Sequence, residues 1–524
     1  MGTSDLHGNI ERGVVLSGYV ENLRKVRKHD GGVVLVDAGD MFQGTLAANE
    51  TEGAAVIRLY NAMGYNAAVV GNHEFDYGPA GPAAIPASPS DDRRGALIAA
   101  AKLARFPVLT ANILMKDTGA AVQWPGIAPS TMVDVAGIKV GIVGVTTDET
   151  LRTTIAANVD DLRVGPLAEA ITAQARKLRD QGAKVVVAAA HAGGDCANFD
   201  NPDDVSSCKP EEIFAVARAL DPKLVNVIIG GHTHRAVAHR VNGIPIIQSR
   251  AYGTAFGRVD LVVDPASGEV SVKKIHAPHR VCEEKESDAP TCTPGEYEGE
   301  RVQPSAQARD AAAPDLAAAD AKRKQQLGVT LATKLKARGA PSSPLGDQLA
   351  AWMLEVRPAA QIAYINAGGI RKDLPEGPLT YGAFFEMFPF DNRFASTTVK
   401  VSAVRKLFVH GLSGGHGFSV AGVQVRAKCG MAGLEVELIH KGKRLRDDQT
   451  VSLLMSDYLA MTPSVNEAGM PKESFKYEDA PPIREALVEH LRKKGGTVTA
   501  PAAAMITTPE GVFPVKCGGK DTGH

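Results

Sequence analysis

Five short apolar runs constrain the fold of this chain more strongly than any other feature of its sequence. They are VVLVDAG at 33–39, AAVVGN at 67–72, VGIVGV at 140–145, VVVAAAH at 185–191 and VNVIIGGH at 225–232. Each run is typical of a buried strand, and helix-like segments separate the runs, which indicates a layered α/β domain. In such domains the functional groups follow the carboxyl ends of the strands. We therefore expect the polar residues that end these runs to lie at one edge of the sheets.

The residues at the strand ends are of the types that bind divalent cations. Asp5 and His7 are two residues apart, so on an extended strand end both side chains project to the same side and can hold one cation. Asp, His and Asn are ligands for hard to borderline divalent cations, and several such groups in one domain indicate a centre for two of them. The remaining candidate ligands are Asp40, Asn72, His191, His232 and His234.

The pattern of the sequence changes after about residue 300. Residues 258–275 are predicted to form a β-hairpin, and an Ala-rich, charged stretch at 305–326 is predicted to form one solvated helix. A second series of strands and helices begins at residue 328. A chain of 524 residues also exceeds the size at which single hydrophobic cores stop growing. We therefore expect a domain at 1–300, a linker helix at 301–327 and a smaller domain at 328–524.

The charge and hydropathy of the chain exclude two classes of partner. The formal net charge is -1, so the chain has no basic field that would attract a nucleic acid polymer, whereas a small anionic substrate needs only local positive charge. No run of eighteen apolar residues occurs, so no transmembrane segment is predicted. Met1 and Gly2 leave no room for the strand that should precede Asp5. We therefore expect sequence upstream, with room there for a secretion signal.

The six cysteines favour disulfide bonds in an oxidising compartment. None of them has the C-x-x-C spacing of a zinc site, and two of the pairs lie close together in polar loops. The alternative is free thiols in a cytosolic enzyme. With disulfides, the protein is expected to be periplasmic, exposed at the cell surface or secreted. The expected pairs are Cys196 with Cys208, Cys282 with Cys292, and Cys429 with Cys517.

A set of motifs in a fixed order resembles a known family. The motifs DLHGN, GDMFQGT, GNHEFDYG, AAHAGG and GGHTH are similar to those of the calcineurin-like metallophosphatase domain. Together with NAGGIR and FPFDN downstream, they resemble the bacterial and animal 5′-nucleotidase family. The resemblance implies a layered α/β-sandwich metallophosphoesterase domain, joined by a linker helix to a smaller α/β substrate-binding domain. It also implies two divalent metal ions, zinc, manganese or similar, which share Asp40 as a ligand.

The resemblance assigns the other ligands to the two metals and names a catalytic pair. One metal would be held by Asp5, His7 and His234 with Asp40, and the other by Asn72, His191 and His232 with Asp40. His73 stands beside the ligand Asn72 and is placed to assist the leaving oxygen with a proton. Asp76 is its expected partner, since an adjacent carboxylate favours the imidazolium. The alternative for Asp76 is a plain turn residue.

The second domain carries candidate residues for substrate binding. Asn366, Gly369 and Arg371 belong to the motif NAGGIR, where glycines permit close approach to a ligand and the arginine offers a fork of donors. Phe390 and Asn392 in FPFDN match base-contacting positions of the family, and Tyr458 matches its second aromatic. Three positions depart from the family pattern: Ala367 replaces a glycine, Ser464 stands where a ribose-binding aspartate is expected, and Arg338 is offset from a family arginine.

The sequence therefore predicts a 5′-nucleotidase-like phosphoric ester hydrolase that acts on a nucleoside 5′-monophosphate or another phosphate ester. Related families use the same metals on 2′,3′-cyclic nucleotides, on nucleotide pyrophosphates or on sulfur esters, and fold alone does not choose among these substrates. A non-enzymatic alternative is a nucleoside-binding surface protein. The intact set of candidate ligands, together with His73 and Asp76, argues against that alternative.

Overall fold

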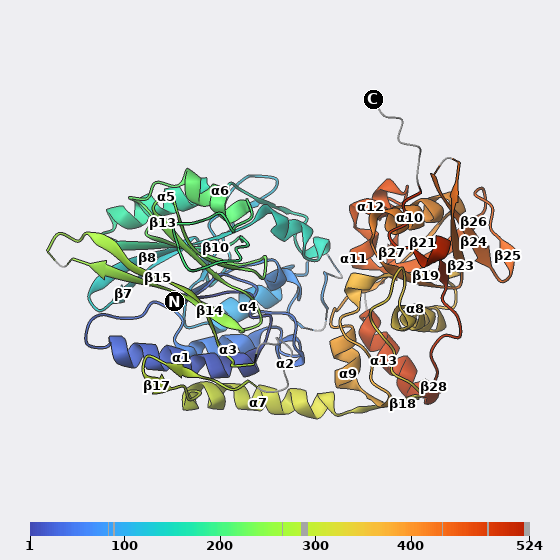
Figure 1. Cartoon of the computed structure of the whole chain (residues 1–524), viewed down its shortest axis with the longest axis horizontal. Helices are drawn as coiled ribbons and strands as arrows, with labels where there is room; N and C mark the ends of the chain where they lie inside the picture. Colours follow the sequence, from blue (N-terminus) through green and yellow to red (C-terminus); the bar gives the residue numbers. More distant parts are fainter. Residues whose placement is uncertain are drawn as a thin grey trace. The chain divides into compact units, whose positions relative to one another are not determined.

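The chain divides into two compact units, Met1–Ala319 (unit 1) and Asp320–His524 (unit 2). The computed structural model describes residues 1–81, 83–86, 88, 90–264, 266–284, 292–431, 433–478 and 481–517. The division lies within α7 (Ala306–Arg323), in the segment for which a linking helix is expected. Unit 1 runs from blue to yellow-green in Figure 1, and unit 2 from yellow to red.

Unit 1 contains two mixed β-sheets. In the first, β1, β2, β3, β4 and β6 are parallel, and the antiparallel hairpin of β14 and β15 extends the edge at β1. Its order is β15 (Val270–Arg280), β14 (Ala255–Val263), β1 (Gly2–Thr3), β2 (Val36–Asp37), β3 (Ala67–Val69), β4 (Val108–Leu109) and β6 (Ile127–Ala128). The hairpin predicted from the sequence is therefore confirmed.

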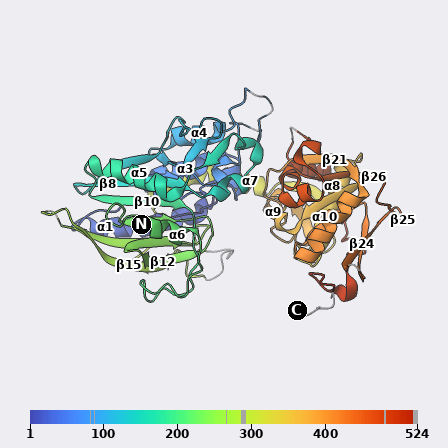
Figure 2. The same cartoon turned by 90° about the horizontal axis from the view of Figure 1, so that it is seen from above.

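The second sheet of unit 1 has a parallel centre with antiparallel strands at both edges. Its order is β12 (Ala236–Val241), β13 (Ile244–Ser249), β11 (Val227–Gly230), β10 (Val185–His191), β8 (Ile138–Thr146) and β7 (Ser130–Val135). Figure 2 shows β12 beside β15 of the first sheet, and these strands contact each other. Two smaller pairs complete the strands of unit 1: β5 (Ile113–Met115) with β9 (Leu162–Val164), and β16 (Glu296–Tyr297) with β17 (Glu300–Arg301).

Helices cover the two sheets of unit 1. In Figure 1, α1 and α3 lie on one side of the strands, and α5 and α6 lie on the other. The helices are α1 (Ile10–Arg27), α2 (Leu46–Asn49), α3 (Ala54–Met63), α4 (Gly95–Leu103), α5 (Leu167–Asp180) and α6 (Glu212–Ala219). Because helices and a second sheet cover both faces, all seven residues of β10 are buried, as its apolar sequence predicts. The apolar run at 33–39 gives a shorter strand, since only Val36 and Asp37 pair with both neighbours.

Unit 2 contains three sheets and six further helices among its described residues. The first sheet has the order β20 (Gly377–Thr380), β18 (Gln326–Leu331) and β28 (Gly496–Val498). The second has the order β22 (Phe418–Ala421), β19 (Ile362–Asn366), β26 (Thr450–Ser456), β21 (Phe394–Lys400) and β27 (Lys476–Tyr477). The third has the order β25 (Lys443–Arg444), β24 (Gly433–His440), β23 (Gln424–Gly430) and β29 (Ile506–Thr507). The helices are α8 (Pro344–Val356), α9 (Tyr381–Met387), α10 (Val401–Gly414), α11 (Asp457–Ala460), α12 (Pro463–Glu467) and α13 (Ile483–Lys494).

The helix α8 begins at Pro344. Ser343 precedes it and accepts a hydrogen bond from the backbone N–H of Gly346 at 3.0 Å. A serine cap followed by proline at the first position is a favourable helix start, because the cap satisfies a free N–H and proline presets the backbone angle. Trp352 on this helix is fully buried, so the helix packs into the core of unit 2.

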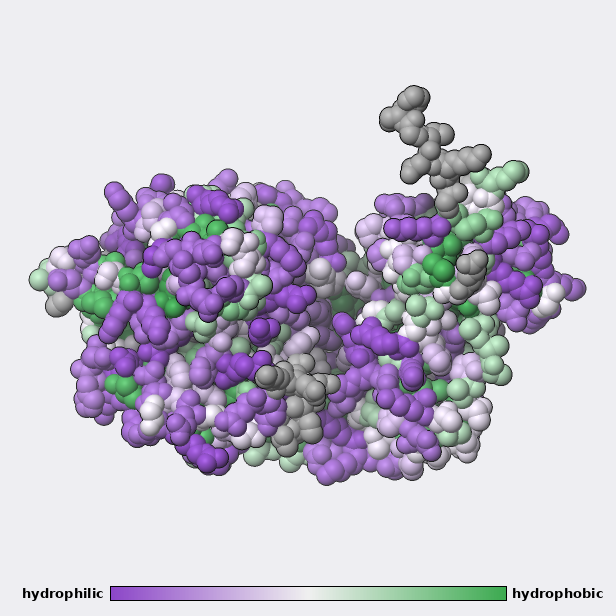
Figure 3. Space-filling model, viewed as in Figure 1, coloured by the Kyte–Doolittle hydropathy of each residue, from purple (hydrophilic) through white to green (hydrophobic). Residues whose placement is uncertain are grey.

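Three disulfides are present, and their pairing is the one expected from the sequence. They join Cys196 with Cys208, Cys282 with Cys292, and Cys429 with Cys517. The last bond ties the C-terminal segment to β23, and a short 3₁₀ turn at Pro509–Gly511 precedes Cys517. The face of each unit seen in Figure 3 is mainly hydrophilic, with apolar residues in small patches. Among the described helices, none is long and apolar enough to cross a membrane.

Candidate metal centre

The polar residues that follow parallel strands of both sheets meet in unit 1. Asp5 and His7 follow β1, Asp40 follows β2, and Asn72 follows β3, all in the first sheet. The second sheet contributes His191 as the last residue of β10, and His232 and His234 after β11. Seven side chains from five segments thus gather in two groups that have Asp40 in common.

The first group contains Asp5, His7, Asp40 and His234. Their nearest ligand atoms all lie within 4.8 Å of one another. The Nε2 atoms of His7 and His234 face each other at 3.0 Å, and Nε2 of His7 is 3.8 Å from Oδ2 of Asp40. Oδ2 of Asp5 is buried without a hydrogen-bond partner among the described residues. A buried carboxylate oxygen in this condition is unfavourable unless a cation or another donor reaches it.

The second group contains Asn72, His191, His232 and Asp40. Nε2 of His191 is 3.0 Å from Oδ1 of Asn72 and 3.2 Å from Oδ2 of Asp40. Nδ1 of His232 is 3.1 Å from Oδ1 of Asn72 and 3.2 Å from Nε2 of His191. Four ligands bound tetrahedrally at about 2.0 Å from a cation lie about 3.3 Å apart, so these distances fit one cation.

Electrostatics also favours a cation in the first group. Burial raises the pKa of Asp5 to about 8, since an isolated carboxylate is costly in an apolar interior. Burial lowers the pKa of His7 to about 3 and that of His234 to about 4, so both imidazoles are neutral near pH 7. A neutral imidazole has the free electron pair that metal binding requires, and a cation offsets the charge of the carboxylates. The residues present therefore fit a pair of divalent cations.

The backbone at the ligands differs from the extended strand end expected for Asp5 and His7. These two residues have φ angles of 52° and 48°, in the left-handed region, because the chain turns directly after β1. Asp40, His232 and His234 share this conformation. Non-glycine residues in sparsely populated backbone regions cost about 1–3 kcal/mol each, and such strain is found at functional sites. The turns aim the ligands, and the surrounding hydrogen bonds hold them there.

Glu74 holds the loop that carries Asp40, a role that the sequence did not reveal. Its buried carboxylate accepts hydrogen bonds from the backbone N–H groups of Asp40 at 2.9 Å, Met41 at 2.7 Å, Phe42 at 3.2 Å and Gly71 at 2.6 Å. Burial raises the pKa of Glu74 to about 7. The signal for this role lies within the motif GNHEFDYG, where an acidic residue follows the histidine. Its partners could not be known before the fold.

Glycine at position 71 is required by a close approach. A Cβ atom built on Gly71 would lie 2.3 Å from Oδ1 of Asp40 and 2.7 Å from the Asp40 backbone nitrogen. Real Cβ atoms do not approach other atoms so closely, and the clash would displace the shared carboxylate. Any larger residue at this position would therefore disturb both groups of ligands.

His73 and Asp76 form a pair beside the two groups. Nδ1 of His73 is 2.5 Å from Oδ2 of Asp76, and Oδ1 of Asp76 accepts a hydrogen bond from the Thr154 hydroxyl at 2.8 Å. The backbone N–H of His73 donates to Oδ1 of Asp40 at 2.9 Å, and the His73 ring lies 5.0 Å from that of His7. Burial alone would lower the pKa of His73, but Asp76 and then Asp40 raise it to about 10. Thr154 was not singled out from the sequence.

Two further residues near the ligands were also missed. Glu149 accepts from Nε2 of His232 at 3.0 Å. Tyr252 is 39% exposed, and its ring centre lies 5.4 Å from that of His7 and 5.2 Å from that of His234. Glu149 lies in the 3₁₀ turn Asp148–Arg152 just after β8, at the end of one of the five predicted strands, and Tyr252 lies in a loop after β13. Neither contact could be inferred from the spacing of the sequence.

In unit 2 the candidate substrate-binding residues lie in three segments. Asn366 ends β19, and Gly369 ends the 3₁₀ turn that follows it. Arg371 is exposed, and its guanidinium lies 5.0 Å from the ring centre of Phe390. Asn392 is half-buried, and its carbonyl accepts from the backbone N–H of Ile483 at 2.7 Å. Tyr458 on α11 is 48% exposed. Ser464 lies in α12, and Arg338 is exposed in a loop.

Buried contacts in unit 2 hold the segment FPFDN in place. Arg484 is 4% exposed and donates to the carbonyl oxygens of Pro389 at 3.0 Å and Phe390 at 3.3 Å, and it pairs with Asp391. The backbone N–H of Asp457 donates to the carbonyl of Arg393 at 2.9 Å, which joins the helix of Tyr458 to this segment. No role could be assigned to Arg484 from the sequence, because a single arginine on a helix carries no recognisable signal.

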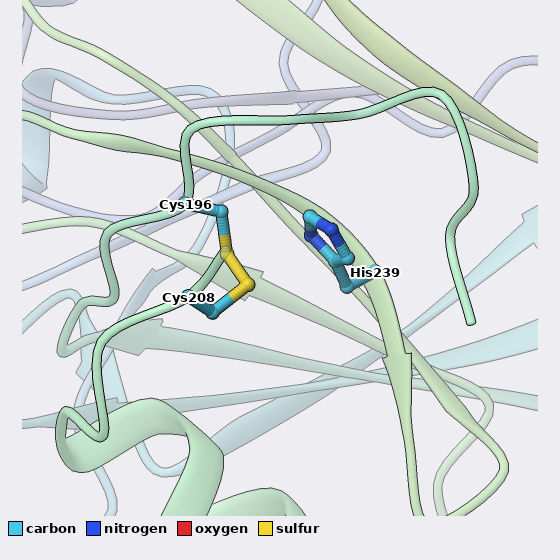
Figure 4. A group of neighbouring side chains, drawn as sticks. All are labelled: Cys196, Cys208 and His239. Atoms are coloured by element: carbon cyan, nitrogen blue, oxygen red, sulfur yellow. A yellow bond between two sulfur atoms is a disulfide. The ribbon is translucent and has the colours of Figure 1, made fainter. Parts of the chain in front are cut away.

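A third cluster with metal-binding residue types does not act as a metal site in the oxidised chain. Cys196, Cys208 and His239 lie close together, as Figure 4 shows. The two sulfur atoms are joined in a disulfide, so neither is available as a thiolate ligand. His239 alone would be a single neutral ligand in a buried position.

Two family models match the chain. The model described as calcineurin-like phosphoesterase matches residues 1–236, and the model described as 5′-nucleotidase, C-terminal domain matches residues 321–464. The first match ends just past the candidate ligand His234. The second covers the segments NAGGIR and FPFDN and extends to Ser464.

Individual proteins and a solved structure are similar over most of the chain. Endonuclease YhcR of Bacillus subtilis is 23% identical over 94% of this chain and 38% of its own length. Protein UshA of Yersinia enterocolitica is 26% identical over 77% of this chain and 74% of its own. The structure of a 5′-nucleotidase precursor from Thermus thermophilus shares the fold, with a TM-score of 0.66 and 22% identity over 97% of this chain and 98% of the other. This chain spans less than half of the length of several curated relatives.

Proposed function

Because this chain belongs to the family of 5′-nucleotidases with a calcineurin-like phosphoesterase domain, we propose that it hydrolyses phosphate monoesters, nucleoside 5′-monophosphates in particular. The observation that carries the proposal is the pair of ligand groups sharing Asp40, with His73 and Asp76 beside them. A phosphoryl group carries negative charge on its oxygens, and two adjacent cation sites suit it. In the reaction a water molecule attacks phosphorus, the ester P–O bond breaks, and the leaving oxygen receives a proton.

The metal ligands are those assigned above, with Asp40 as the shared carboxylate. When bound, the two cations offset the charge of the phosphoryl oxygens and lower the pKa of water, so that it becomes a nucleophile near neutral pH. Zinc and manganese both suit a set of imidazole, carboxylate and amide ligands. Glu74 keeps the loop of Asp40 in position by accepting four backbone hydrogen bonds.

His73 is the proposed acid for the leaving oxygen. Its Nδ1 is committed to Asp76, so Nε2 is the atom that can donate a proton to the substrate. Asp76 is itself held by the Thr154 hydroxyl, which fixes the ring of His73. Positioned acids of this kind contribute factors of about 10²–10⁴ to the rate.

Unit 2 is proposed to recognise the nucleoside part of the substrate. Phe390 and Tyr458 present aromatic faces for a base, and Arg371 offers donors to anionic or ribose oxygens. Asn366, Gly369 and Asn392 complete the proposed contacts. Support comes from the buried contacts of Arg484, which hold the segment of Phe390, and from the backbone bond between Asp457 and Arg393.

The three disulfides support a location outside the reducing cytosol, and we propose that the protein is periplasmic, at the cell surface or secreted. Ser464 stands where the family pattern has an acidic residue, so a strict preference for ribose is not expected. Other phosphate esters are therefore possible substrates. 2′,3′-cyclic nucleotides, nucleotide pyrophosphates and sulfur esters are the alternative substrates.

The test is a substrate panel with purified protein loaded with manganese or zinc. The panel contains nucleoside 5′-monophosphates, an aryl phosphate, 2′,3′-cyclic nucleotides, a nucleotide pyrophosphate and a sulfur ester. We expect the highest kcat/KM for phosphate release from nucleoside monophosphates. After a chelator has removed the metals, we expect no phosphate release from any compound. Asp40→Ala should be inactive on every compound. Turnover of no compound by metal-loaded protein, with nucleosides still bound, would instead support a binding protein.

A further inference from the structure

We propose that Glu149 is a positioning residue that fixes the ring of His232 and thereby strengthens the binding of one of the two cations. The inference rests on the proposed function, in which His232 is a metal ligand. It goes further by assigning a role to a carboxylate that lies outside every sequence motif of the site. Three features of the structure support it: the orientation of the ring, the chemistry of its outer partner, and the way in which Glu149 is anchored.

Both ring nitrogens of His232 have partners. Nδ1 faces the second group of ligands, at 3.1 Å from Oδ1 of Asn72 and 3.2 Å from Nε2 of His191. Nε2 points the other way and lies 3.0 Å from Oε2 of Glu149. Because a carboxylate only accepts hydrogen bonds, the ring proton resides on Nε2, and Nδ1 keeps the electron pair that binds a cation.

His232 differs in this respect from His7 and His191. These two rings turn Nε2 toward the other candidate ligands, His234 and Asn72. Their Nδ1 atoms lie against backbone carbonyls, those of Gln43 at 3.0 Å and Ala38 at 2.9 Å. His232 is reversed, and its outer partner carries a full negative charge. A carboxylate in this place orients a ligating imidazole and raises its basicity more than a neutral carbonyl does. A change of this one side chain should therefore affect one cation selectively.

The segment that carries Glu149 is tied to the metal centre through the backbone. Glu149 lies in the 3₁₀ turn Asp148–Arg152, and the Thr147 hydroxyl before it accepts from the Glu149 N–H at 3.3 Å. The backbone N–H of Thr147 donates to the carbonyl of His191 at 2.9 Å. The turn is thus anchored to one ligand of the same cation while its side chain reaches another.

The pair is open to solvent on one side. The Glu149 side chain is 55% exposed, and that of His232 is 14% exposed. Exposed ion pairs add little to folding stability, so removal of the carboxylate should leave the protein folded. An effect on cation binding can then be separated from an effect on the fold.

The experiment measures Mn²⁺ binding to metal-free protein, with free Mn²⁺ followed by electron paramagnetic resonance. In Glu149→Ala we expect one of two sites to weaken by about 10–100-fold, the range found when outer partners of metal ligands are removed. Glu149→Gln keeps an acceptor but loses the charge, so its loss should be smaller. Thermal unfolding of the metal-free variants should match that of the wild type.

Asp148→Asn is the matched control. It removes the same charge one residue earlier in the same turn, and Asp148 pairs with Arg152 at 3.2 Å rather than with a histidine. We expect wild-type Mn²⁺ binding in this variant. Equal weakening in Asp148→Asn would show a general effect of charge, and unchanged binding in Glu149→Ala would remove the positioning role. Either result would overturn the proposal. Because binding is measured without substrate, its outcome is independent of which ester, if any, is hydrolysed.

Discussion

The candidate residues of unit 1 and those of unit 2 are held in opposite ways. In unit 1, Asp5 and His191 are fully buried, and the loops that carry the ligands are cross-linked by hydrogen bonds to Glu74 and between strands. In unit 2, Tyr458 is 48% exposed and Arg371 is exposed as well. The buried contacts of unit 2 involve the backbone beneath these side chains instead, as with Arg484.

In the proposed function this difference corresponds to two tasks. Reaction chemistry needs groups fixed within a fraction of an ångström, and that requires burial and strain, as in the left-handed ligand residues. Recognition of a planar base needs exposed faces that a ligand can cover. We therefore expect changes in unit 1 to alter kcat and metal content, and changes in unit 2 to alter mainly KM.

The largest effect is expected for the shared carboxylate. Asp40→Ala removes a ligand from both groups and the acceptor for the His73 backbone N–H, so both metals and all turnover should be lost together. Elemental analysis and phosphate release measure the two quantities. Asp117→Ala, at an exposed loop position of the same unit, is the control and should behave as wild type. Two tightly bound metals in the Asp40 variant would contradict the bridging role.

A smaller loss, without metal release, is expected for His73→Gln. The glutamine cannot serve as an acid, so kcat should fall by about 10²–10⁴-fold while metal content stays unchanged. Steady-state kinetics combined with elemental analysis tests this, and His29→Gln at an exposed position is the control. If the variant loses metal, His73 belongs among the ligands.

The aromatic residues of unit 2 should affect recognition alone. Replacing Phe390 and Tyr458 together by alanine removes two stacking contacts of about 1–3 kcal/mol each, so KM for a nucleoside monophosphate should rise by about tenfold or more. Hydrolysis of a simple aryl phosphate should continue nearly as before. Equal losses on both substrates would show that the two aromatics are structural, and the contrast between the units would fail.

The pH dependence of the rate should depend on Asp76. Because this carboxylate raises the pKa of His73, the protonated ring persists at neutral pH and is lost only as the pH rises through the raised pKa. In Asp76→Asn the pKa falls, so the alkaline loss of kcat should begin at lower pH. At pH values above the original pKa, a decrease of about one unit leaves a tenfold smaller protonated fraction and hence a tenfold lower rate. Profiles of kcat across neutral and alkaline pH that coincide for both proteins would exclude this coupling.

The smallest effect concerns the sugar. Ser464 stands where a ribose-binding aspartate is expected, so ribose and deoxyribose monophosphates should differ in kcat/KM by less than about threefold. This ratio corresponds to the net free energy of one weak hydrogen bond. Competition between the two substrates measures this ratio directly. A strong preference for ribose would show that another residue of unit 2 makes the contact.

Much of the metal centre could be predicted because its residues follow parallel strands. Apolar runs predict such strands, and parallel strands of one sheet bring their carboxyl ends to one edge, so Asp40 and Asn72 could be placed together without coordinates. His191 ends a strand of the second sheet, so its place beside them depends on how the two sheets pack. The conformation of Asp5 and His7 could not, since a left-handed turn replaces the extended strand end. The cysteine pairs could be predicted as well, because two of them lie close in sequence.

The sequence by itself determined the α/β class, the set of candidate metal ligands, the proposed catalytic pair His73 and Asp76, and the disulfides. These follow from local composition, short spacings and motif order. Only the tertiary structure decided which ring nitrogen of each histidine faces the other candidate ligands, and which carboxylates contact those ligands or their loops. Glu74 reaches backbone groups more than thirty residues away, and Glu149 reaches His232 across 83 residues. Contacts of this kind depend on how strands and loops pack in space, and spacing along a chain carries no record of that packing.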